Sequence, residues 1–154
     1  MAQFYIPVGS VTGTALGVAD SVAQFLESAG HSAQVDQNAS VAMLNSNNWD
    51  AILVISATTG QGDIPSNLLS FYCDLEATFP LQNGRPFGVI CLGDSSYDRT
   101  FCQAGALLEE RFFEIQGRAL IPRITIDATE TVTPDVDALH WVKEWLTHFD
   151  KLSA

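Results

Sequence analysis

The stretch Gly9-Ser10-Val11-Thr12-Gly13-Thr14-Ala15 decides the fold. It follows an apolar run from Phe4 to Val8, and a helical pattern begins near Thr14. The two glycines let the backbone bend tightly, and the first turn of a helix presents unpaired N–H groups where the helix dipole favours an anion. Ser10, Thr12 and Thr14 add hydroxyl groups. The stretch is therefore interpreted as a phosphate-binding loop between a strand and a helix.

This loop contains no lysine, and the first Lys or Arg of the chain is Arg85. Local amides and hydroxyls would hold a phosphate here, unless a distant arginine folds back onto it. Nucleoside triphosphatases use a loop of the form GxxxxGK[ST], and dinucleotide-binding proteins use GxGxxG after a strand. Residues 9–15 match neither spacing, which argues against both classes of protein.

Short apolar runs alternate with longer amphipathic ones along the chain, as in repeated strand–helix units. Two of the apolar runs show no alternation, as expected for parallel strands that are covered on both faces. Strands are predicted over Phe4–Val8, Ala33–Val35, Ala51–Ser56, Phe87–Leu92 and Leu120–Ile126. Helices are predicted from near Thr14 to Gly30, and over Ser40–Leu44, Asn67–Ala77, Thr100–Gln116 and Pro134–Lys151.

This rhythm predicts a single α/β domain over residues 1–154, with a doubly wound sheet of five parallel strands and helices on both faces. Right-handed crossovers favour the strand order 2-1-3-4-5. Ligands of such sheets bind beyond the carboxyl ends of the strands. After the third strand comes a loop with two glycines, residues 56–67, and after the fourth a polar loop, residues 92–102, with Tyr97 at its tip. Together with the first loop they suit a flat ligand with a phosphate tail.

These loops carry a resemblance to the flavodoxins. Ser10-Val-Thr-Gly-Thr-Ala15, Thr58-Thr-Gly-Gln-Gly-Asp63 and Leu92-Gly-Asp-Ser-Ser-Tyr97, followed by Phe101-Cys102, resemble the three FMN loops of that family. The resemblance covers nearly the whole chain and is closest to the MioC-type and YqcA-type short-chain flavodoxins and to the FMN domains of diflavin reductases. The insertion that splits the fifth strand of long-chain flavodoxins is expected to be missing.

The resemblance implies that the cofactor is FMN, and it assigns roles position by position. The residues implied to hold the phosphate are Ser10, Val11, Thr12, Gly13 and Thr14. Those implied to border the flavin are Thr58, Thr59, Gly60 and Gln61, and those of the opposite wall are Leu92, Gly93, Asp94, Tyr97, Phe101 and Cys102, with Tyr97 stacked on the ring. Thr59 stands close to where many relatives have an aromatic residue.

Composition narrows the class of partner. The chain has 18 acidic and 7 basic residues, a net charge of −11, which argues against nucleic acids and anionic membranes as partners. The negative charge of the chain is explained either by binding to a basic protein partner or by solubility alone. The three cysteines have no C-x-x-C spacing, which favours free thiols over a disulfide framework or a metal site, and therefore a cytoplasmic protein. No targeting segment is recognised.

The resemblance, together with these features, predicts a low-potential one-electron carrier. Acidic residues near the flavin disfavour added negative charge, and Gly60 lets a carbonyl turn to accept the hydrogen at N5 of the flavin. The resemblance implies a flavodoxin/ferredoxin-NADP reductase as donor, with a basic-surfaced enzyme as acceptor and a monomeric carrier. An FMN-dependent two-electron reductase of the quinone type is the alternative. A phosphorylation-controlled receiver domain fits worst, because Gly9-Ser10 and Asp127-Ala128 stand where its acidic cluster and lysine belong. No catalytic constellation is found.

Overall fold

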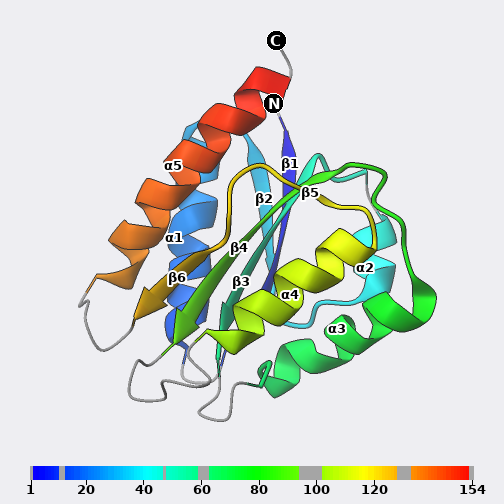
Figure 1. Ribbon diagram of the computed structural model, residues 1–154. Helices are drawn as coiled ribbons and strands as arrows, with labels where there is room; N and C mark the ends of the chain where they lie inside the picture. The colour runs from blue at the N-terminus through cyan, green and yellow to red at the C-terminus, as the bar shows by residue number, and fades with distance from the viewer. Residues whose placement is uncertain are drawn as a thin grey trace.

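The computed structural model describes residues 2–10, 13–46, 48–58, 63–93, 102–127 and 133–152. Strands and helices alternate along these residues, as the sequence predicts (Figure 1). In chain order the elements are β1 (Gln3–Gly9), α1 (Thr14–Ser28), β2 (Ser32–Asp36), α2 (Val41–Ser46), β3 (Ala51–Ala57), α3 (Ser66–Thr78), β4 (Pro86–Gly93), α4 (Gln103–Glu114), β5 (Arg118–Ala119), β6 (Ile124–Asp127) and α5 (Pro134–Leu152).

The strands form one parallel sheet in the order β2-β1-β3-β4, with β5 and β6 both paired to β4. The predicted order 2-1-3-4-5 is therefore confirmed, with two segments sharing the fifth place. The register sets Phe4 beside Ala51 and Ile52 beside Phe87. Because every pair is parallel, the carboxyl ends of all strands meet at one edge of the sheet, which lies at the bottom of Figure 1.

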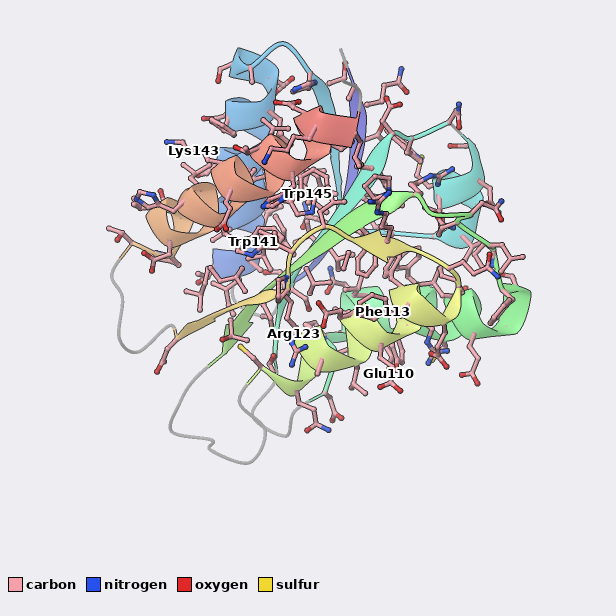
Figure 2. All side chains as sticks on the ribbon, turned by 45° about the horizontal axis from the view of Figure 1, so that its top comes forward. Glu110, Phe113, Arg123, Trp141, Lys143 and Trp145 are labelled. Atoms are coloured by element: carbon pink, nitrogen blue, oxygen red, sulfur yellow. The ribbon has the colours of Figure 1, made fainter. Side chains whose placement is uncertain are left out.

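The prediction of one continuous strand over Leu120–Ile126 is wrong. Sheet pairing stops after Ala119 and resumes at Ile124. Pro122 has no N–H to donate to a neighbouring strand. The N–H of Arg123 donates instead to Glu109 Oε2 on α4 at 3.0 Å, and its guanidinium contacts Glu109 Oε1 at 2.7 Å. The side chain of Arg123 therefore ties the interruption to α4 (Figure 2).

Helices cover both faces of the sheet. Helices α1 and α5 lie on one face, and α2, α3 and α4 lie on the other (Figure 1). Side chains of a strand point alternately to the two faces, so Phe4, Ile6 and Val8 pack toward α1 and α5, while Tyr5 packs toward α3. Because both faces of the sheet are buried, β3 and β4 are apolar without alternation.

Two tryptophans of α5 anchor this helix on the sheet (Figure 2). Trp145 is fully buried, and its Nε1–H donates to the carbonyl of Phe87 at 3.1 Å. Trp141 Nε1–H donates to the carbonyl of Pro122 at 3.1 Å. Both residues are part of the core. Among the described residues, no helix combines the length and the apolar character that crossing a bilayer requires.

Candidate functional site

The loop between β1 and α1 presents backbone amides at the start of a helix. Gly13 is the N-cap of α1, has a φ of 92° and has no side chain with which to cap the helix. This backbone conformation costs a residue with a Cβ about 1–2 kcal/mol, which explains a glycine at this position. The N–H of Gly13 donates to Ser10 Oγ at 2.9 Å. The loop therefore gathers a hydroxyl and helix N–H groups in one place, a donor set that suits a phosphate.

Beside this loop lies a pocket of about 390 Å³. Three separate segments form its wall: the β1–α1 loop, the turn after β2 and the first turn of α3. The lining residues are Ser10, Gly13, Leu16, Gln37, Asn38 and Asn67. None of these residues carries a charge, and their polar groups are hydroxyls and amides. Among the described lining residues none is a carboxylate that would repel an anion, and the Asp36 carboxylate contacts this lining through the N–H of Asn38.

Asn67 connects the three segments of this pocket. Its Oδ1 accepts the N–H of Ser10 at 3.1 Å, and its Nδ2 donates to the carbonyl of Val8 at 2.9 Å and to that of Gln37 at 3.0 Å. The sequence prediction did not include Asn67 among the site residues. Its position in the first turn of the helix after the third strand was the available signal, since that turn lies at the carboxyl edge.

The turn after β2 is held by Asp36. Its Oδ2 accepts the hydroxyl of Tyr5 at 2.7 Å, and its Oδ1 accepts the N–H of Asn38 at 2.8 Å. Tyr5 is fully buried and stacks on Trp49, with ring centroids 5.1 Å apart. Burial raises the pKa of the Tyr5 phenol far above its ordinary value, and the hydrogen bond and negative charge of Asp36 raise it further.

Alkaline pH should destabilise the protein through Tyr5. The folded state keeps the phenol proton at pH values where the unfolded chain releases it, so stability is retained below about pH 10 and falls above it by about 1.4 kcal/mol per pH unit for this group. Tyr5→Phe removes the titrating group, and the decline of stability should become shallower by that slope. Urea unfolding between neutral and alkaline pH measures the difference. Equal slopes in the two proteins would contradict the assignment to Tyr5.

The flavin side of the predicted site lies where β3 and β4 end. The N–H of Thr58 donates to the carbonyl of Leu92 at 2.9 Å, and Thr58 Oγ1 lies 3.1 Å from Cys91 Sγ. Cys102 is the N-cap of α4 and has a φ of 53°, and its thiol donates to the carbonyl of Cys91 at 3.5 Å. Gly93 pairs with Asp127 at the end of β6. These contacts hold the starts of two predicted flavin loops side by side.

Cys91 and Cys102 are both buried, whereas Cys73 is exposed, and all three are free thiols. The contact with Cys91 and burial raise the pKa of the Cys102 thiol. Cys102 therefore remains a neutral hydrogen-bond donor at neutral pH. Leu92 and Cys102 are buried as whole residues, at 3% and 2% exposure.

The structure brings the described site residues to the same edge of the sheet. These are Ser10, Gly13, Thr14, Thr58, Leu92, Gly93 and Cys102. Thr14, the first residue of α1, is exposed. The other predicted site residues lie outside the described residues: Val11, Thr12, Thr59, Gly60, Gln61, Asp94, Tyr97 and Phe101. Their roles remain predictions.

Comparisons with known proteins agree with this arrangement. The model of the flavodoxin family matches residues 6–141. Flavodoxin YqcA of Pectobacterium carotovorum is 36% identical over 145 residues, covering 94% of this chain and 95% of that protein. Protein MioC of Escherichia coli strain K12 is 33% identical, covering 95% and 97%. The solved structure of a cysteine-to-serine mutant of flavodoxin from Pseudomonas aeruginosa superposes with a TM-score of 0.91 at 39% identity, covering 96% of this chain and 99% of that chain.

Proposed function

Because the chain belongs to the flavodoxin family, as a short-chain flavodoxin related to YqcA, MioC and the FMN domains of diflavin reductases, we propose that it binds FMN and carries single electrons between a reductase and an acceptor enzyme. Bound FMN would supply the redox chemistry, by accepting and releasing electrons one at a time. The protein would supply binding, orientation and electrostatics.

The observation that carries this proposal is the uncharged pocket beside the N-terminus of α1. A phosphate group needs N–H and hydroxyl donors. The hydroxyl of Ser10 accepts the N–H of Gly13 at the start of α1 and lies in the pocket, where the helix dipole favours an anion. The donor set therefore fits the phosphate of FMN, and a lysine is not needed to balance it.

The chain's residues would act on the flavin mainly through backbone groups. Thr58 follows the end of β3 and Gly93 ends the adjacent strand β4, so their peptide groups can line a flat ring and orient it. The buried contacts among Thr58, Cys91 and Cys102 fix the base of both loops. Such a preformed floor can hold a ring in the same position through repeated electron transfers.

Charge supports a low potential and a basic partner. Asp127 ends β6 beside Gly93, and Asp63 is exposed just before α3, within a chain of net charge −11. A unit charge a few ångströms from the ring is worth about 1–4 kcal/mol, depending on the effective dielectric, so negative charge added to the flavin is disfavoured. The same acidity would attract the basic surface of a flavodoxin/ferredoxin-NADP reductase and of an acceptor enzyme.

An anaerobic reductive titration of the FMN-loaded protein, followed by visible absorbance, tests this proposal. A one-electron carrier should show a long-wavelength band that grows and then decays as reductant is added. Reduction by NAD(P)H without another protein, and without this band, would point instead to a two-electron reductase of the quinone type. Failure to bind added FMN at all would overturn the cofactor assignment.

A further inference from the structure

We propose that Asn67 is a positioning residue, which sets the phosphate-binding loop and thereby makes the site prefer FMN over riboflavin. The inference rests on the proposed FMN function and deepens it. Riboflavin has the same ring and ribityl chain but no phosphate. A residue that acts only on the phosphate-binding loop should therefore change the affinity for FMN and leave the affinity for riboflavin nearly unchanged.

The carboxamide of Asn67 is held in one orientation by its three partners. The two hydrogens of Nδ2 face the carbonyls of Val8 and Gln37, and Oδ1 faces the N–H of Ser10. Rotating the amide by half a turn would set an oxygen against two carbonyl oxygens and an NH₂ group against an N–H. The arrangement therefore has one satisfied state, which fixes the distance of the β1–α1 loop from α3.

The hydrogen bond between Asn67 and Ser10 occupies one backbone N–H of the loop and positions the side chain of Ser10. Because Oδ1 of Asn67 accepts the N–H of Ser10, that N–H is already occupied. The N–H of Gly13 donates to Ser10 Oγ at 2.9 Å, so the side chain of Ser10 lies beside the start of α1 at the pocket. Asn67 thus fixes the backbone of the residue whose side chain meets the start of α1, and with it the geometry of the donors.

Close packing makes this connection rigid. Gly9 lies between Val8 and Ser10, the two neighbours that Asn67 contacts, and it packs against Leu68, the next residue of α3. A Cβ built on Gly9 would come within 3.0 Å of Leu68 Cδ2 and 3.2 Å of Leu68 Cβ. The loop therefore cannot move toward α3 to compensate for a lost hydrogen bond. Removing the carboxamide should leave the donors misplaced rather than let them close up.

Binding of FMN and of riboflavin to the apoprotein, measured by quenching of flavin fluorescence, tests the inference. We expect Asn67→Ala to weaken FMN binding by about tenfold or more, because it removes three hydrogen bonds from the loop. The affinity for riboflavin should change by less than about threefold on the same scale. Ser70→Ala is the matched control, because Ser70 is an exposed residue of the same helix and the change has a similar effect on helix propensity.

Asn67→Asp provides a second variant with nearly the shape of asparagine. It keeps an acceptor for the N–H of Ser10, loses both donors and adds a negative charge beside the pocket. It should weaken FMN binding at least as much as Asn67→Ala, and the loss should shrink at high salt because ions screen the repulsion. Riboflavin binding should show no such salt dependence. This variant decides the question if Asn67→Ala fails to fold.

The outcomes separate the two proposals. If the unaltered protein binds neither flavin, the proposed function fails. If it binds FMN and both Asn67 variants lose FMN and riboflavin affinity by the same factor, Asn67 supports the site as a whole and the positioning role is wrong. If neither affinity changes, the hydrogen bonds of Asn67 do not set the loop, and the inference is overturned as well.

Discussion

Replacing Gly88 with alanine is expected to lower the free energy of unfolding by about 3 kcal/mol, at the upper end of the cost of overpacking a core. Gly88 lies in β4 and faces α5. A Cβ at this position would come within 2.5 Å of Trp141 Cη2, 2.9 Å of Trp145 Nε1 and 3.1 Å of Leu53 Cδ2. Real Cβ atoms do not approach other atoms this closely, so the two tryptophans must move.

Moving these side chains has a second cost. Trp145 Nε1–H donates to the carbonyl of Phe87 in the buried core, and a shift that relieves the clash would stretch this bond. A buried carbonyl that loses its donor costs about 1–3 kcal/mol. Equilibrium unfolding in urea would measure the loss of stability. A blue shift or intensity change of tryptophan fluorescence in the folded variant would show that α5 has moved.

Gly17→Ala is the matched control for this experiment. Gly17 lies within α1, and a Cβ built there meets no atom of the described residues within 4 Å. Alanine should therefore stabilise the helix by about 0.5–1 kcal/mol, since glycine is a poor helix former. The same chemical change would thus have opposite signs at the two positions. A loss of less than about 1 kcal/mol for Gly88→Ala would mean that the core accommodates a methyl group.

Much of the fold could be predicted because local and global signals agree. The run from Ala51 to Ser56 is apolar without alternation, and the structure buries it between helices on both faces. Gly30, with a φ of 92°, follows the end of α1 closely, as a glycine after a helical pattern predicts. The last helix was predicted to begin at Pro134, and α5 begins there. Periodicity and end signals were enough for these elements.

The fifth strand could not be predicted in the same way, because long-range contacts decide it. Leu120 to Ile126 is apolar enough for a strand, although Pro122 within it has no N–H to donate to a neighbouring strand. The interruption is fixed by Glu109, which takes the backbone N–H and the guanidinium of Arg123 from a different element. Nothing local to residues 120–126 reveals this partner. Pro122 is visible in the sequence, but the contact of Glu109 with Arg123 is not.

In the candidate site, too, residues with a local signal could be predicted, and a residue with long-range contacts could not. Glycines and hydroxyls of the predicted phosphate-binding loop were proposed from local pattern, and Gly13 has a positive φ. Asn67 escaped notice because its role depends on carbonyls and an N–H from β1 and from the turn after β2, which are distant in sequence. An asparagine near a helix start has an ordinary local explanation as a capping residue, which hides a tertiary role.

Gly9→Ala is expected to lower the free energy of unfolding by about 2 kcal/mol through overpacking. We also expect it to weaken FMN binding by about tenfold, because a shift of the first turn of α3 displaces the contacts of Asn67. Gly9 is the last residue of β1 and pairs with Ser56. Its new Cβ would lie 2.7 Å from Ser56 Oγ and 3.0 Å from Leu68 Cδ2. Urea unfolding and flavin fluorescence quenching measure the two effects separately.

A second substitution shows whether the clash is the cause. Ser56→Ala removes the Oγ atom that lies nearest to the new methyl group, at the cost of the hydrogen bond from this Oγ to the carbonyl of Ala57. In the double variant the methyl group would occupy the space of the missing oxygen, so the two losses should not add. We expect a coupling free energy of about 1 kcal/mol, because residues in contact typically couple by about 0.5–3 kcal/mol. Full recovery is not expected, since the contact with Leu68 remains. Strict additivity would show instead that Gly9 is needed for a reason other than the space beside Ser56.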